Sequence, residues 1–270
     1  MADESAISVA RGAGSVGPAA NGGYLEAAVG GLSDVGRVRE LNEDNWAWER
    51  IDDDIALYAV ADGMGGHDRG EVASQIAVES LFEAAKAALK KVQVHDVNSL
   101  RETLRGAVQT ANRSVVAAGE AQDSNMGTTL TCGLIYKGQE AVVANVGDSR
   151  TYLLRGDKLR AVSQDHSLVA YLVQLGELTA EEARTHPSGN ILVRSIGSMP
   201  EVEVDVYHVN VQAGDRLMFC SDGLWGELPD SEIRSILLAH EDQDAACRAL
   251  VDRANEAGGR DNSTLVIVRV

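Results

Sequence analysis

Two long helical segments interrupt a series of short apolar runs, and this order restricts the fold more than any other feature of the sequence. The runs have the length of strands that are covered on at least one face, and they span 55–61, 129–136, 141–146 and 215–220. Between the first two runs, apolar residues recur at steps of three and four in 69–92 and again in 100–115. A doubly wound sheet would instead alternate single strands with single helices. The order therefore predicts an α+β fold with mostly antiparallel sheets.

A polar stretch at about 165–190 separates two strand-like regions and carries its own helix signals. The segment 167–176 has a helical pattern, and Thr179-Ala180-Glu181-Glu182 matches a capping box, in which two side chains satisfy backbone N–H groups at a helix start. We therefore predict a small flap subdomain here. Further elements are predicted as helices near 231–240 and 243–256 and as a core strand at 264–270.

The N-terminal segment differs in composition from the rest of the chain. Residues 1–28 are rich in Gly, Ala and Ser and show no sustained periodicity, so we expect a flexible leader. The chain has 270 residues, which corresponds to one large domain or two small ones at roughly 150 residues per domain. We interpret 29–270 as a single domain.

Charge and cysteine content exclude several classes of protein. The net charge of -17 would be repelled by nucleic-acid backbones and by anionic membrane surfaces, so neither is expected as a partner. The three cysteines include no C-x-x-C pair, which argues against a disulfide scaffold and a thiolate zinc site. No apolar run approaches the roughly 18 residues of a membrane span, and the first residues do not resemble a secretory signal. We expect a cytoplasmic protein in a reducing compartment.

Four aspartates share one placement, at the boundary between an apolar strand and a turn that contains glycine. They occur in Asp62-Gly63, Gly147-Asp148, Asp222-Gly223 and Gly259-Arg260-Asp261. Asp and Gly both favour turns, so ordinary turn chemistry and a shared site both remain open from this pattern alone. In a shared site the carboxylates would need cations to offset their repulsion. Oxygen ligands on loops favour Mg²⁺ or Mn²⁺, and a pair of such ions can activate a bridging water for attack at phosphorus.

The segment Arg39-Glu40-Leu41-Asn42-Glu43-Asp44 places a cation a few residues before a carboxylate pair. By itself it favours a surface ion-pair loop over the alternative, an Arg fork that binds phosphate oxygens beside metal-binding carboxylates. The neighbouring run Asp52-Asp53-Asp54 is interpreted as a solvated turn outside any site.

Taken together, these segments resemble the successive signatures of the PPM/PP2C-type metal-dependent protein serine/threonine phosphatases, in the compact bacterial form. The matching strings appear in the family's order, as Arg39-Glu40-Leu41-Asn42-Glu43-Asp44, Ala61-Asp62-Gly63-Met64-Gly65-Gly66-His67, Gly147-Asp148-Ser149-Arg150, Gln164-Asp165-His166-Ser167, Ser221-Asp222-Gly223-Leu224-Trp225 and Arg260-Asp261-Asn262. They extend from about residue 31 to 270. The resemblance implies a four-layer α-β-β-α sandwich, in which two antiparallel sheets are flanked by helices and metals lie in a cleft at one edge.

The resemblance also implies a role for each matching residue. Two Mn²⁺ or Mg²⁺ ions would be bridged by Asp62, one of them also bound by the Gly63 carbonyl. Asp222 and Asp261 would be ligands of one ion, and Glu43 or Asp44 would support the other ion, largely through waters. Asp148 and Asp222 would form a weaker third metal site. Arg39 would bind the substrate phosphate. Some members carry His directly after Asp-Gly, where this chain has Met64, and His67 is the candidate general acid in its place.

The activity implied is direct hydrolysis of phosphoserine and phosphothreonine monoesters by a metal-bridging water or hydroxide. The partners would then be phosphorylated proteins, in particular a Ser/Thr kinase and its substrates, and we expect a monomer. Two alternatives remain: a pseudophosphatase that serves as a binding module on the same scaffold, and a metal-dependent phosphodiesterase. The complete set of expected ligands argues against the first, and the acidic charge argues against the second.

Overall fold

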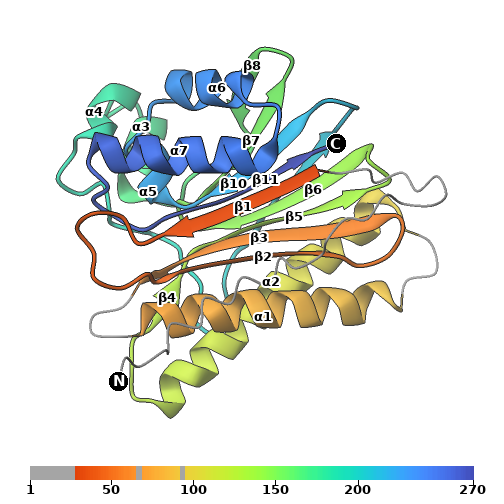
Figure 1. Ribbon diagram of the computed structural model, residues 1–270. Helices are drawn as coiled ribbons and strands as arrows, with labels where there is room; N and C mark the ends of the chain where they lie inside the picture. The colour runs from red at the N-terminus through yellow and green to blue at the C-terminus, as the bar shows by residue number, and fades with distance from the viewer. Residues whose placement is uncertain (1–27, 65–68, 92–94) are drawn as a thin grey trace, which may run out of the picture.

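Two antiparallel sheets lie face to face, with helices on the outer side of each, in the computed structural model of the protein (Figure 1). The model describes residues 28–64, 69–91 and 95–270. This arrangement confirms the predicted α+β class and the order helix, sheet, sheet, helix. The leader predicted at 1–28 lies outside the described residues except for Ala28, which is already the first residue of a strand. His67 also lies outside them.

The first sheet has the strand order β1-β11-β10-β7-β8, and every neighbouring pair in it is antiparallel. Its strands are β1 (Ala28–Asp34), β7 (Arg150–Arg155), β8 (Lys158–Ala161), β10 (Arg216–Cys220) and β11 (Ser263–Arg269). Helices α6 (Asp230–Ala239) and α7 (Gln243–Ala257) pack on its outer face through a buried apolar cluster. Both helices lie close to the predicted ranges.

The second sheet has the order β2-β3-β5-β6-β9, and the short strand β4 pairs with the end of β3. Its strands are β2 (Asp44–Arg50), β3 (Ile55–Met64), β4 (Gly127–Thr128), β5 (Leu130–Tyr136), β6 (Glu140–Val146) and β9 (Asp205–Asn210). Helices α1 (Gly70–Leu89) and α2 (Val97–Ala121) cover its outer face with the apolar stripes read from the sequence. Together the two helices fill the insertion that separates β3 from β4.

Strand β3 explains why its sequence is an unbroken apolar run. Successive side chains of a strand point to opposite faces, and both faces of β3 are buried. Ile55 and Leu57 pack with the outer helices, whereas Ala56 and Tyr58 pack between the sheets. The Tyr58 ring stacks on Phe219 of the opposite sheet, with ring centroids 5.9 Å apart. The two sheets therefore share an apolar interior away from the edge that carries the acidic residues.

The predicted flap lies between β8 and β9 and contains two short helices, α3 (Leu168–Gln174) and α4 (Ala180–Arg184). Ser167 caps α3 by accepting a hydrogen bond from the backbone N–H of Ala170. Both hydrogen bonds of the predicted capping box are formed between Thr179 and Glu182. A one-turn helix, α5 (Asp222–Trp225), follows β10, where the sequence predicted a turn. No helix in the described part of the chain is both long and apolar enough to cross a membrane.

Candidate active site

Five aspartates from both sheets meet at one edge of the sandwich. Asp44 begins β2 and is paired across the ladder with Asp62, near the end of β3. From the other sheet, Asp222 begins α5 directly after β10 and Asp261 precedes β11, while Asp148 lies in the β6–β7 turn that connects the two sheets. Asp62 and Asp222 lie close enough for each to perturb the pKa of the other. The shared-site interpretation, which the sequence pattern left open, therefore agrees with where these residues lie.

Burial and mutual repulsion perturb these carboxyl groups strongly. Burial, followed by the charges of Asp44, Asp222 and Asp148, raises the pKa of Asp62 well above its usual range. Burial raises the pKa of Asp44 to about 8, although Ser221 donates a hydrogen bond to its Oδ2 at 2.7 Å. The pKa values of Asp148 and Asp222 are also raised, first by burial and then by a neighbouring aspartate. Such a cluster needs protons or cations to reduce its repulsion.

The oxygen atoms of this cluster fit divalent cations. Within the described residues, Oδ1 of Asp44 and Oδ1 of Asp222 are buried and have no hydrogen-bond partner. A buried carboxylate oxygen without a partner is costly unless a cation binds it. In the same part of the chain, no group of three or more His, Cys, Asp or Glu side chains is arranged so that it could hold a metal ion by itself. The side chains of the cluster offer oxygen donors alone, and such donors suit Mg²⁺ or Mn²⁺.

The loop before β2 brings Arg39 and Glu43 to the same edge. The Arg39 guanidinium is paired with Oδ2 of Asp261 at 2.7 Å, and both side chains remain partly exposed. Oε1 of Glu43 accepts a hydrogen bond from the N–H of Gly70 at the start of α1. Of the two adjacent acids that the sequence left as alternatives, Asp44 is thus the buried member of the cluster, and Glu43 is turned toward the helix.

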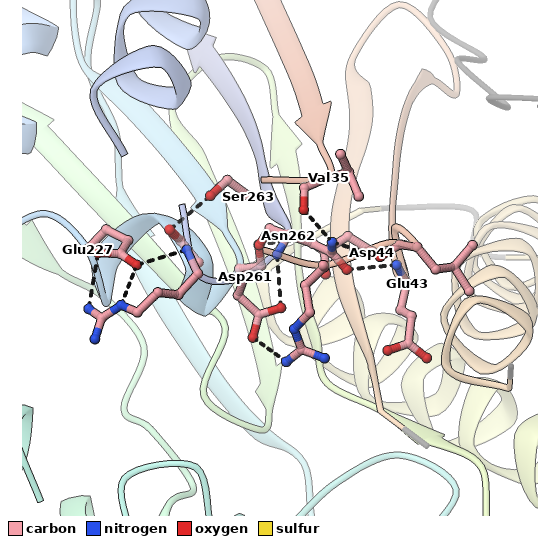
Figure 2. A network of polar contacts seen from close by, with 12 residues as sticks. Val35, Glu43, Asp44, Glu227, Asp261, Asn262 and Ser263 are labelled. Carbon is pink, nitrogen blue, oxygen red and sulfur yellow. Dashed lines mark hydrogen bonds and ion pairs between the residues drawn. The ribbon is translucent and has the colours of Figure 1, made fainter. Parts of the chain in front are cut away.

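Asn262 holds this loop against the start of β11, as Figure 2 shows. Its Oδ1 accepts a hydrogen bond from the N–H of Glu43 at 2.8 Å. Its Nδ2 donates to the carbonyls of Val35 at 2.9 Å and Leu41 at 3.0 Å. One amide side chain thus fixes three backbone positions of the segment that carries Arg39 and Glu43.

Two of the glycines beside the aspartates are required by close approach of the backbone. A Cβ atom on Gly63 would lie 2.2 Å from the carbonyl oxygen of Gly70, and one on Gly223 would lie 2.0 Å from the carbonyl oxygen of Asn262. Real Cβ atoms do not approach backbone atoms so closely, so a larger residue would push the two loops apart. Both glycines therefore let the aspartate loops pack against neighbouring segments.

The Asp148 turn is held from the flap side. The N–H of Gly147 donates to Nδ1 of His166 at 3.1 Å, so a neutral His166 carries its proton on Nε2. Burial and the charge of Arg194 lower the pKa of His166, which favours this neutral form. From the other side, the Trp225 indole N–H donates to the Asp148 carbonyl at 3.1 Å. His166 thus acts as an orienting residue that connects the flap to the Asp148 turn.

An ion pair ties the base of the flap to α5. The guanidinium of Arg150 bonds both carboxylate oxygens of Asp165 and lies 3.5 Å above the ring centroid of Trp225. A cavity of about 550 Å³ opens beside this pair. Asp148, Asp222 and Asp261 line one part of it, and residues of α3 and α4 line another. A substrate that enters the cavity can therefore reach the carboxylates.

Every predicted site residue that lies in the described part of the chain is found at this edge. By contrast, Asp52-Asp53-Asp54 forms the separate turn that was predicted, in which Oδ1 of Asp52 accepts from the N–H groups of Asp54 and Ile55. Sequence reasoning assigned no role to Asn262, Ser221 or Thr129. Asn262 and Ser221 stand beside an aspartate in motif strings, and Thr129 begins an apolar run, but a single polar residue has no periodic signal of its own.

Comparison with known proteins gives a consistent picture. The family described as Protein phosphatase 2C matches residues 36–259. The chain is 40% identical over 238 residues to a serine/threonine phosphatase, stp, of Listeria welshimeri, which covers 87% of this chain and 93% of the relative. The serine/threonine phosphatase of S. agalactiae has a similar structure, with a TM-score of 0.82, 33% identity and coverage of 90% of this chain and 99% of that one. The catalytic domain of PstP, solved in complex with two manganese ions, matches with a TM-score of 0.77 at 34% identity, over 90% of this chain and 97% of its own.

Proposed function

Because the chain belongs to the protein phosphatase 2C family and is a protein phosphatase of the bacterial serine/threonine type, we propose that it hydrolyses phosphoserine and phosphothreonine monoesters with the help of Mn²⁺ or Mg²⁺. The observation that carries this proposal is the meeting of five aspartates from two sheets, two of which present buried oxygen atoms without a partner among the described residues. The manganese ions of the PstP catalytic domain support the choice of metal.

The proposed ligands are divided between the two sheets. Asp62 lies opposite Asp44 across the strand ladder, and the charges of Asp44, Asp222 and Asp148 all raise its pKa. It is therefore the best candidate to bridge two ions. The proposed remaining ligands are the carbonyl of Gly63, the side chains of Asp222 and Asp261, and Asp44 or Glu43 through water, with Asp148 and Asp222 as a weaker third site. When bound, such ions lower the pKa of a shared water and stabilise negative charge at phosphorus.

The protein's own residues orient the substrate and shield the reaction. Arg39 is the proposed phosphate-binding residue, because its fork of N–H donors lies next to Asp261 and remains partly exposed. The Arg39 guanidinium bonds Asp261, so a phosphate must share or take over these donors. His67 stays a candidate for protonating the leaving oxygen. The cavity between the cluster and the flap has room for residues that flank the phosphorylated side chain.

We infer that the substrates are phosphorylated proteins and that the chain reverses the action of a Ser/Thr kinase in the cytoplasm. The relatives named as serine/threonine phosphatases support the substrate class. The three cysteines are free and buried, as expected for packing residues in a reducing compartment. We propose a monomer, in which the aspartates of one chain suffice to form the cluster.

The decisive test is hydrolysis of a phosphothreonine peptide and of p-nitrophenyl phosphate by the purified chain with Mn²⁺. We expect turnover with Mn²⁺, none with EDTA, and a loss of at least roughly 100-fold in kcat/KM for Asp222→Ala, since both the charge and the ligand are removed. Asp53→Ala is the matched control, because Asp53 is an exposed aspartate of the separate turn and should leave activity unchanged.

The alternatives give different results in the same experiment. A folded protein that binds Mn²⁺ and phosphopeptide without turnover would be a binding module, and the proposed catalytic function would be wrong. Cleavage of a phosphodiester such as bis-p-nitrophenyl phosphate in preference to the monoester would identify a phosphodiesterase.

A further inference from the structure

We propose that buried hydroxyl groups between the two sheets position the metal-binding carboxylates relative to one another, with Thr129 as the central positioning residue. This inference rests on the proposed function and extends it to residues that bind neither metal nor substrate. The hydroxyl seam, as we name it, consists of Thr129, Thr131, Ser149, Thr151 and Ser221, and each of these residues is at most 2% exposed.

The seam crosses from one sheet to the other at three points. Thr129 Oγ1 and Ser149 Oγ are 2.6 Å apart, and Thr131 Oγ1 and Thr151 Oγ1 are 2.8 Å apart. In both pairs the first residue precedes or belongs to β5 and the second precedes or belongs to β7. At the third point Ser221, after β10, donates to the Asp44 carboxylate of β2. These contacts lie on the acidic side of the interior that is otherwise apolar.

Hydroxyl contacts fix the position of the sheets in a way that apolar contacts do not. Apolar packing, as between Tyr58 and Phe219, depends little on direction and tolerates small shifts. A hydrogen bond between buried hydroxyl groups is lost when the partners move apart, and the unpaired group then carries a desolvation cost. The seam therefore resists sliding of one sheet past the other at the edge where the carboxylates meet.

Thr129 connects this seam to the carboxylates directly. The N–H of Asp62 donates to Thr129 Oγ1 at 3.0 Å, and the N–H of Thr129 donates to the Asp62 carbonyl at 2.8 Å. On its other side Thr129 contacts the Asp148 turn, through the hydroxyl of Ser149 and through Gly147, where a Cβ would lie 2.7 Å from the Thr129 side chain. One side chain thus links the Asp62 loop at the end of β3 to the Asp148 turn, which connects β6 of the second sheet to β7 of the first.

Metal ions require a narrow range of ligand positions, so a loss of this link should weaken metal binding. Residues that orient metal ligands from behind commonly change affinity by roughly 10- to 100-fold when they are mutated. Thr131 offers a matched comparison, because its hydroxyl pair is equally buried and crosses the same sheets, one step further from the acidic edge.

The experiment compares Thr129→Val, Thr129→Ser and Thr131→Val by calorimetric titration with Mn²⁺ in the absence of substrate, with the melting temperature of each metal-free variant measured in parallel. Valine keeps the shape of threonine and removes the hydroxyl, whereas serine keeps the hydroxyl and removes the methyl group. We expect Thr129→Val to raise the Kd for Mn²⁺ by roughly 10-fold or more. Thr129→Ser and Thr131→Val should keep a wild-type Kd even where their melting temperatures fall.

Equal Kd values for Thr129→Val and Thr131→Val would overturn the proposal, because the hydroxyl would then act on stability alone. If Thr129→Val does not fold, Ser149→Ala tests the same link from the other sheet, and it should also raise the Kd. A wild-type chain that binds no Mn²⁺ would refute the proposed function together with this inference. If the wild type binds Mn²⁺ and Thr129→Val binds it with the same Kd, this inference alone is refuted.

Discussion

Asn262 shows how much geometry one side chain can determine at this site. Its Nδ2 group donates two hydrogen bonds and its Oδ1 accepts one, all with backbone groups of the segment 35–43. Asn262 directly follows Asp261 in the sequence. The same residue type plays an equivalent part elsewhere: Asn112 of α2 bonds the N–H of Gly197 and the carbonyls of Met199 and Pro200. Both asparagines are buried, but only the loop held by Asn262 carries proposed site residues.

This difference predicts different outcomes for two alanine substitutions. Asn262→Ala and Asn112→Ala should each lower the free energy of unfolding by about 1–3 kcal/mol, because buried backbone groups lose their partners. Only Asn262→Ala should also lower kcat/KM on a phosphopeptide by at least about 10-fold, since Arg39 and Glu43 lose their support. Chemical denaturation and steady-state kinetics measure the two effects. A similar loss of activity in both variants would mean that activity follows general stability.

The pKa of Asp44 predicts how the metal-free protein responds to pH. Burial raises this pKa to about 8, so the folded state holds a proton that the unfolded state releases at about pH 4. The stability is therefore greatest below the unfolded pKa and is lost as the pH rises from about 4 through about 8. Asp62, Asp148 and Asp222 contribute with the same sign.

We expect the melting temperature in EDTA to fall between pH 5 and pH 8, and Mn²⁺ to reverse the fall at pH 8. Asp44→Asn removes one of the charges and should reduce the slope, with a gain of about 2–4 °C at pH 8 for each kcal/mol recovered. Asp53→Asn, at an exposed position, serves as the control. An unchanged slope in Asp44→Asn would show that Asp44 is not a source of the instability.

At the scale of elements, two helices begin with the same local motif but differ in what they pack against. Both α2, through Asp96 and Ser99, and α4, through Thr179 and Glu182, form complete capping boxes. Helix α2 runs from Val97 to Ala121 and buries an apolar stripe against the second sheet, whereas α4 has no buried residue. The cap of α4 is therefore a large part of what keeps that helix folded.

Removal of each cap should consequently be detected by a different measurement. Asp96→Ala should lower the global melting temperature by about 2–4 °C, because a cap contributes roughly 1 kcal/mol to a helix that unfolds with the core. Thr179→Ala should leave the melting temperature nearly unchanged and increase amide hydrogen exchange within 180–184. Equal exchange in Thr179→Ala and the wild type would show that the flap is held by contacts other than its cap.

At the scale of the whole molecule, the acidic surplus governs the approach of substrates. The net charge of -17 includes the carboxylates around the cavity, while the proposed phosphate-binding Arg39 is paired with Asp261. A negative field attracts positively charged partners and repels negatively charged ones over distances set by the ionic strength. Metal ions in the site would reduce this field locally but leave the rest of the acidic surface unchanged.

Phosphothreonine peptides with basic flanking residues should therefore be hydrolysed with a higher kcat/KM than peptides with acidic flanks. The difference should be large near 0.01 M salt, where the screening length is about 30 Å, and small near 0.15 M, where it is about 8 Å. A third peptide with neutral flanking residues gives the reference value of kcat/KM. A preference for acidic flanks at low salt would indicate a local basic subsite that outweighs the net charge.

The sequence alone determined the features that depend on near neighbours along the chain. The apolar steps of α1 and α2, the unbroken run of β3, the capping box of α4 and the turn at 52–54 were all predicted, because each follows from residues only a few positions apart. The succession of motifs also indicated the protein phosphatase 2C family, whose model matches residues 36–259. Predicted element ends differed by a few residues, as at Asp222, which begins a helical turn rather than a loop.

Only the tertiary structure decided which side chains meet. Asn262 and Glu43 are 219 residues apart in the sequence, and Thr129 precedes a strand of one sheet whereas Ser149 precedes a strand of the other, so no local pattern could connect them. The burial of Asp44, the turn of Glu43 toward α1 and the pairing of Arg39 with Asp261 likewise result from how the two sheets pack. Periodicity depends on the backbone geometry of one segment, whereas the site depends on the relative position of two sheets, which is fixed only when the whole interior has formed.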